Sequence, residues 1–197
     1  MFIRIFMTSI LVNNADLSFG QTLPDWVNTQ EMQYFEYPDN SYLIQSVTDN
    51  DGNTYLIAPD KKSGFPNIDT SIVVVFKINS SGILQWKTNY DGYYHQGSFG
   101  RSIDLDDFGN ILIAGVSTNH DIDSEYATIL KLDFNGNPLW DYVYLGKECK
   151  EDVIVKNGSN NSIYLGFNIF SFSPPDQIIL LKFDYTGNLV WQNSFND

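Results

Sequence analysis

The amino-acid sequence predicts an all-β protein, a propeller-like array of about three four-stranded antiparallel blades that is incomplete or open. Short apolar runs rich in β-branched and aromatic residues alternate with clusters of Asn, Asp, Ser and Gly, which is typical of strands joined by tight turns. These runs recur three times with a period of 51 to 54 residues. Four strands in a repeat of that length are typical of a propeller blade.

The first element is a predicted secretory signal peptide, residues 1–20. Arg4 supplies a positive start, residues 5–12 form a short apolar run, and Ser18 and Gly20 place small residues before a cut at Gln21. The run is too short to span a bilayer as a mature helix, and no later stretch qualifies. We therefore expect a protein that is secreted or displayed on the cell surface. The alternative is an N-terminal strand or helix of the fold itself.

The next elements are a lead-in and three blades. Residues 21–37 form the lead-in, with an orphan outer strand near Trp26, which lies 60 residues before Trp86. The three blades are expected at 38–92, 98–146 and 149–197. In the second blade, the four strands are expected at 101–106, 111–117, 127–133 and 139–145.

The third blade already contains an outer strand, 189–195, so the orphan strand is not needed to complete it. Three blades are also fewer than the four to eight of most propellers. The hypothesis that follows is that further blades are missing or that the array closes by self-association.

Three residue types keep the same register in every repeat, at intervals of 54 and 51 residues. They are Lys77, Lys131 and Lys182; Gly82, Gly136 and Gly187; and Trp86, Trp140 and Trp191. We expect each glycine to adopt positive φ in a hairpin turn. Each tryptophan is expected to cover the flank of a neighbouring blade, and each lysine to lie at an edge or pair with an acid. A row of stacking platforms for sugars is the alternative for the tryptophans.

The turns carry a second pattern, Asp-x-x-Gly-Asn, at 49–53 and 106–110. Together with the hairpins that run from Lys131 to Trp140 and from Lys182 to Trp191, this pattern resembles the bacterial β-propeller repeats known as SBBP repeats. The resemblance covers about residues 42–197 and implies export and a rigid multi-bladed surface, without any activity. The first repeat departs from it, with Asn79 where the later repeats have Asp.

Composition limits the partners. The chain carries 24 acidic and 11 basic residues, a net charge of −13, so it repels the phosphates of nucleic acids and anionic membrane surfaces. A single cysteine, Cys149, excludes an intramolecular disulfide. A catalytic thiol needs a neighbouring base, and only His95 and His120 are available. We expect a packed thiol instead.

No catalytic motif and no zinc-type cluster of Cys and His is present, so we assign no catalytic residue and expect no cofactor. The weak exception is calcium, for which Asp121, Asp123 and Glu125 place three carboxylates in one predicted loop. A solvated loop is the alternative interpretation. The acidic segment 49–53 begins like a calcium-binding loop but has Thr54 where that loop requires Gly, so we expect a hairpin turn.

Two functions remain from the sequence. The first is a secreted or surface-exposed binding or scaffold module, with an unknown protein or glycan ligand held on loops. The alternative is an extracellular hydrolase or lyase that acts on glycans at the propeller channel. The sequence does not identify the ligand-binding residues of either.

Overall fold

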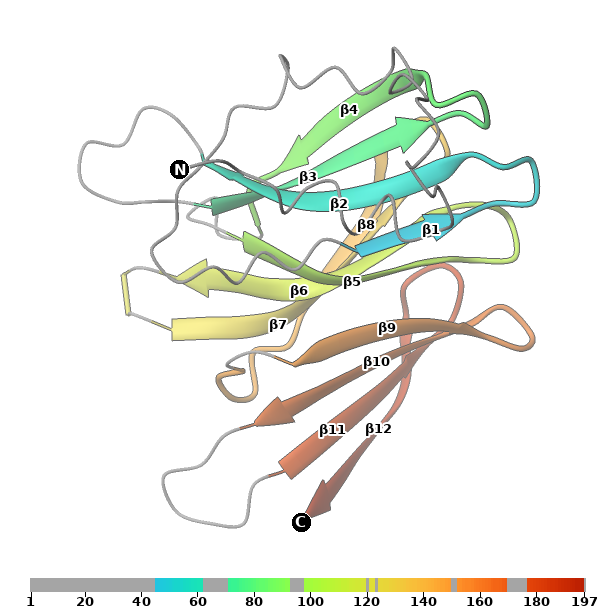
Figure 1. Ribbon diagram of the computed structural model, residues 1–197. Helices are drawn as coiled ribbons and strands as arrows, with labels where there is room; N and C mark the ends of the chain where they lie inside the picture. The colour runs from blue at the N-terminus through green and yellow to red at the C-terminus, as the bar shows by residue number, and fades with distance from the viewer. Residues whose placement is uncertain are drawn as a thin grey trace, which may run out of the picture. The chain divides into compact units, whose positions relative to one another are not determined.

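The computed structural model describes residues 45–61, 71–92, 98–119, 121–122, 124–149, 152–169 and 177–196. Within these ranges the chain is all-β, and twelve strands form three four-stranded antiparallel sheets (Figure 1). The predicted all-β class is confirmed. The predicted signal peptide, 1–20, and the predicted lead-in, 21–37, with its strand near Trp26 lie outside the described residues.

Each sheet is a meander in which consecutive strands pair. Sheet 1 contains β1 (Gln45–Thr48), β2 (Thr54–Lys61), β3 (Ser71–Ile78) and β4 (Leu84–Tyr90). Sheet 2 contains β5 (Ser98–Leu105), β6 (Ile111–Asn119), β7 (Ser124–Leu132) and β8 (Pro138–Val143). Sheet 3 contains β9 (Val153–Gly158), β10 (Ser162–Ile169), β11 (Gln177–Phe183) and β12 (Leu189–Asn196).

The four strands of sheet 2 lie where they were predicted, but their bounds differ from the prediction by up to three residues. We expected a strand at 127–133, but β7 begins at Ser124, because its ladder with β6 continues through Glu125, which pairs with Thr118. Glu125 therefore lies in a strand and not in the predicted loop.

The hairpin turns explain the Asp-x-x-Gly-Asn pattern. In the turn between β7 and β8, Asp133 Oδ1 accepts the backbone N–H groups of Asn135 (2.9 Å) and Asn137 (2.8 Å), and Oδ2 accepts the Asn137 side-chain amide (2.9 Å). Gly136 has φ +85°, a conformation that a side chain disfavours. One carboxylate thus replaces the missing backbone partners of the turn.

The same turn occurs in five hairpins, which begin at Asp49, Asn79, Asp106, Asp133 and Asp184. Asn79 shows that an amide oxygen is sufficient, because it accepts the N–H groups of Ser81 (3.0 Å) and Ile83 (2.9 Å). The segment 49–53 is therefore a hairpin turn, as expected.

The sheets pack face to face, and two cores hold them together. Sheets 1 and 2 share a core formed by Tyr55, Ile57, Val73, Val75, Ile103, Ile111, Ile113, Leu130 and Leu132. Sheets 2 and 3 share a core formed by Leu112, Ala114, Val116, Ala127, Ile129, Cys149, Val153, Val155, Ile163, Leu165, Phe167, Ile169, Ile179, Leu181 and Phe183.

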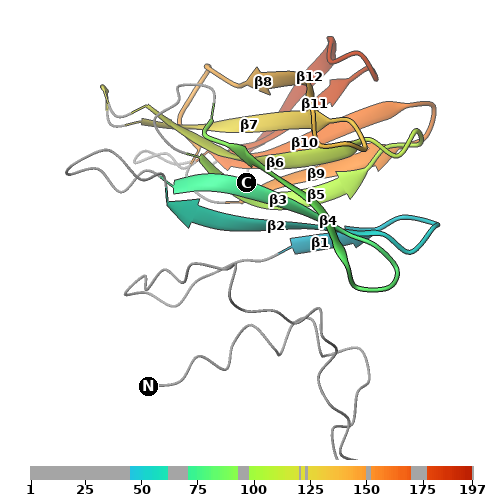
Figure 2. The same cartoon turned by 90° about the horizontal axis from the view of Figure 1, so that it is seen from above.

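Sheet 2 lies between the other two sheets in Figure 1, and in the view turned by 90° its strands overlap those of sheet 3 (Figure 2). It is consequently buried on both faces, as the unbroken burial of β6 from Ile111 to Thr118 demonstrates. The first strands of the three sheets are neighbours, because β1 contacts β5 and β5 contacts β9. Each fully buried aliphatic side chain in the two cores contributes roughly 1.5–3 kcal/mol.

Acid should weaken the hairpin turns. Hydrogen bonds from the Thr186 hydroxyl and from Asn188 lower the pKa of Asp184 from 3.8 to about 2. Because the folded-state pKa is the lower one, the ionised carboxylate stabilises the fold above about pH 4, and this contribution disappears as the pH falls towards 2. We expect Asp184→Asn, which keeps the turn as Asn79 does, to lose less stability than the parent chain between pH 4 and pH 2. Urea unfolding at each pH measures this, and equal losses would contradict the assignment.

Candidate functional site

The contact that joins sheet 1 to sheet 2 uses the repeated Lys, Trp and Gly. Lys77 and Trp86 are cross-strand neighbours on β3 and β4. Trp86 Nε1 donates to the carbonyl oxygen of Phe134 (3.3 Å), and Lys77 Nζ donates to the same oxygen (3.4 Å). A Cβ at Gly136 would lie 3.1 Å from the Trp86 ring, so the absence of a side chain lets the indole pack closely over the turn. We name this arrangement the docking contact.

The docking contact recurs between sheets 2 and 3. Lys131 Nζ (2.9 Å) and Trp140 Nε1 (3.4 Å) both donate to the carbonyl oxygen of Tyr185, and a Cβ at Gly187 would lie 2.7 Å from the Trp140 ring. Lys131 also forms a buried ion pair with Asp106 of its own sheet (2.7 Å). The second docking contact therefore has the same parts as the first, namely two donors, one carbonyl acceptor and one glycine.

Sheet 3 carries the donors of a third docking contact. Lys182 and Trp191 are cross-strand neighbours, and the Trp191 ring lies 6.1 Å from the Tyr164 ring, as Trp86 lies 6.1 Å from Tyr55 in sheet 1. Lys182 Nζ lies 5.6 Å from the centre of the Tyr164 ring. Within the described part of the chain, neither donor reaches a hydrogen-bond acceptor or an anion. The donors are in place without their carbonyl partner.

These donors belong to an exposed sheet face. The strand register places Lys182, Leu180 and Ile178 of β11 on one face with Trp191 and Phe195 of β12, and with Tyr164 and Ile154 of the neighbouring strands. We name this surface the open face. Ile154 is 53 % exposed, Ile178 49 % and Phe195 51 %, whereas Val73, which matches Ile178 in sheet 1, is 3 % exposed.

The predicted calcium candidates do not form a described cluster. Asp121 is exposed, and its backbone N–H donates to Asn119 Oδ1 (3.1 Å). Glu125 lies in β7, and Asp123 lies outside the described residues. Over the part of the chain that the structure describes, no three His, Cys, Asp or Glu side chains gather in a way that would hold a metal ion.

Cys149 is packed in the core between sheets 2 and 3. Burial, together with the carboxylates of Glu125 and Asp152, raises the pKa of its thiol from 9.0 to about 12. The thiol is therefore protonated at neutral pH, which is the opposite of what a nucleophile requires.

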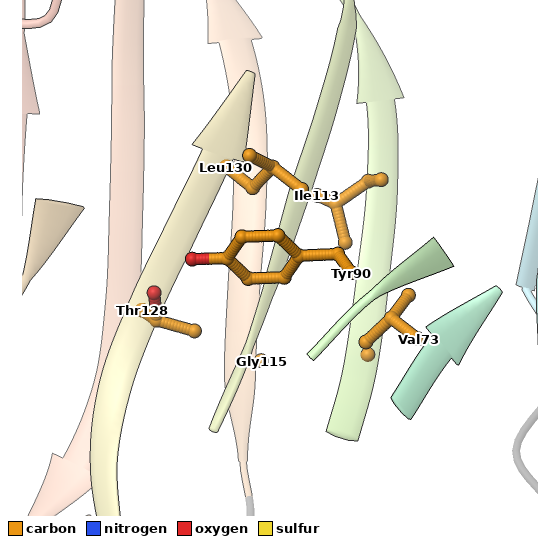
Figure 3. Close-up of a pocket in the computed structure, with 7 residues that line it drawn as sticks. Val73, Tyr90, Ile113, Gly115, Thr128 and Leu130 are labelled. Carbon is orange, nitrogen blue, oxygen red and sulfur yellow. The ribbon is translucent and has the colours of Figure 1, made fainter. Parts of the chain in front are cut away.

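A small pocket lies between sheets 1 and 2, where the Tyr90 ring lies among Val73, Thr128 and Leu130 (Figure 3). Its volume is about 10 Å³, which is room for one water at most. The Tyr90 hydroxyl donates to Asp141 Oδ2 (2.8 Å) and so connects the outer strands of the two sheets. This pocket is a packing feature and not a ligand site of ordinary size.

No family model matches the chain, and no curated protein is significantly similar to it. The resemblance to SBBP repeats therefore stays a prediction. In the described residues no helix is long and apolar enough to cross a membrane.

Sequence reasoning found the donors and the glycines of the docking contact but missed its acceptor. The acceptor is a backbone carbonyl, at Phe134 in one copy and at Tyr185 in the other, and every residue type supplies that group. A signal was nevertheless present, because both residues directly follow the Asp that begins the turn. The open face was missed as well. β11 is buried on one face only, but its sequence is as apolar as that of a strand buried on both faces.

Substitution of the turn glycines should separate backbone strain from loss of docking. Gly109→Ala and Gly187→Ala both place a side chain at positive φ, which costs roughly 1–2 kcal/mol. Gly109 has nothing within 4 Å of the added Cβ, whereas Gly187 is covered by Trp140. We expect Gly187→Ala to cost roughly 1–3 kcal/mol more, because the indole must move. Chemical denaturation of both variants tests this, and equal losses would show that the indole does not depend on the glycine.

Proposed function

We propose that this chain is a propeller-type blade array that works as a binding or scaffold module, and that its binding surface is the open face of sheet 3. One observation carries the proposal. The docking contact is made twice inside the array, and in the described residues its third set of donors, Lys182 and Trp191, lies on an exposed face without a hydrogen-bonded acceptor.

The arrangement of the sheets supports the blade interpretation. Each sheet is a four-stranded meander, the sheets pack face to face, and their first strands are neighbours in the order β1, β5 and β9. Blades of a propeller have this arrangement, with their first strands near a common axis.

The chemistry of the open face favours a protein ligand over a glycan. Its centre is apolar, with Ile154, Ile178 and Phe195 about half exposed, and contiguous apolar surface on a soluble domain marks an interaction site. Tyr164 and Trp191 add aromatic area, which is enriched in protein interfaces. The net charge of −13 disfavours a polyanionic ligand. Export through the predicted signal peptide would place this surface outside the cell.

The apolar dye anilinonaphthalene sulfonate is a direct probe of the open face. We expect the folded chain, diluted to submicromolar concentration, to bind the dye, and the double variant Ile178→Ser with Phe195→Ser to bind at least severalfold less. The matched control is Ile122→Ser with Leu145→Ser, because these side chains are each 60 % exposed and belong to neither the open face nor a docking contact. Dye fluorescence and circular dichroism give binding and folding. Equal dye binding by both double variants, with folding intact, would refute the proposed surface.

A further inference from the structure

Sheet 1 carries the acceptor half of a docking contact. In both contacts inside the array, the acceptor carbonyl belongs to the residue after the Asx that begins the turn of the last hairpin. The matching residue of sheet 1 is Ser80, which follows Asn79, is exposed and has a carbonyl that accepts no hydrogen bond over the described part of the chain. Gly82 completes the turn with φ +79°, close to the +85° of Gly136. The two unpaired halves thus lie on the first and the last sheet of one chain.

The surroundings of the Ser80 turn also match those of the occupied turns. In the array, Trp140 packs against Phe183, the last residue of the strand before the turn, with ring centres 6.1 Å apart. The corresponding residue of sheet 1 is Ile78, which is half-buried, and its cross-strand neighbour Leu84 is 43 % exposed. An apolar platform for a further indole is therefore available beside the turn. The area is limited to this end of the sheet, because Val74 on the same face is already buried.

Charge also favours a contact between Lys182 of sheet 3 and the Ser80 turn of sheet 1. Lys131 is neutralised by Asp106, but the position that matches Asp106 in sheet 3 is Gly158, and Lys182 forms no ion pair within the described residues. The Ser80 turn lies beside the acidic turn 49–53, since a Cβ at Gly52 would be 2.9 Å from Ser80 Cβ. Hydrogen bonds from Asn53 keep the pKa of Asp49 below 3.8 in spite of the desolvation that raises it, so this end of sheet 1 is anionic at neutral pH.

We infer that the occupant of the open face is a second copy of this chain, docked head to tail. Lys182 and Trp191 of one copy donate to the Ser80 carbonyl of the next, and the indole covers Gly82. This inference rests on the proposed binding role of the open face. The interface is heterologous, so two copies close into a ring or continue as a longer assembly. The described residues of two copies together form six sheets, which lies within the four to eight blades of propellers.

Sedimentation velocity of the full chain over a range of concentrations tests the inference. We expect an assembly heavier than the 22.5 kDa of one chain, whose fraction rises with concentration. Trp191→Ala should raise the dissociation constant at least about tenfold, as removal of an aromatic hot spot does. The control Leu145→Ala, at an exposed position away from the open face, should leave it unchanged. On the acceptor side, Gly82→Val should dissociate the assembly, whereas Gly109→Val, with the same sign of φ and open space around it, should not.

A mixing experiment distinguishes head-to-tail docking from a symmetric contact between two open faces. Trp191→Ala copies retain the Ser80 turn, and Gly82→Val copies retain the open face. Head-to-tail docking therefore predicts that each variant alone is largely monomeric and that the equimolar mixture forms heterodimers. A parent chain that is monomeric at every concentration, or a mixture that stays monomeric, would overturn the inference. If the monomeric chain still binds the apolar dye at the open face, the proposed function stands and only the choice of a second copy has failed.

Discussion

The docking contact is the interaction on which the rest of the structure depends. An indole N–H and an ammonium group converge on one backbone carbonyl of the next sheet, and the indole ring lies over a glycine of the same turn. The contact fixes the position of one sheet relative to the next as well as stabilising the pair, because the two donors and the glycine specify a single turn geometry. Apolar burial between the sheets supplies most of the stabilisation, but it is non-directional. The hydrogen bonds to Phe134 and Tyr185 set the register in which those apolar faces meet.

The hairpin turn supplies the acceptor side of the docking contact. Its first residue, Asp or Asn, satisfies the backbone N–H groups of the turn from within, so the following carbonyl remains free to point towards the neighbouring sheet. The glycine supplies the positive φ and leaves room for the indole. The Asp-x-x-Gly-Asn motif is typical of a turn, but it therefore also binds the Trp and Lys side chains of the preceding sheet. This double use explains why Lys, Gly and Trp keep one common spacing.

A repeat of this kind gives a chain of nearest-neighbour contacts, as in other repeat proteins, where each unit is stabilised mainly by the units next to it. Sheet 2 is covered on both faces, whereas the open face of sheet 3 has apolar side chains that are about half exposed. Lys182 and Trp191 keep the arrangement seen in the earlier sheets, so this surface carries two polar donors as well as apolar side chains.

The sequence by itself determined the all-β class, the four-stranded units and the positions of Lys131, Gly136 and Trp140, because strand and turn preferences are local and the repeat superimposes them three times. Only the tertiary structure decided which groups those residues contact. A backbone carbonyl such as that of Tyr185 has no signature in the sequence, and Glu125 joins β7 only because the ladder with β6 extends that far. The exposure of Ile178 also depends on tertiary context. The corresponding residue of β3, Val73, is buried, whereas Ile178 of β11 is half exposed, because burial depends on the neighbouring sheet and not on the strand itself.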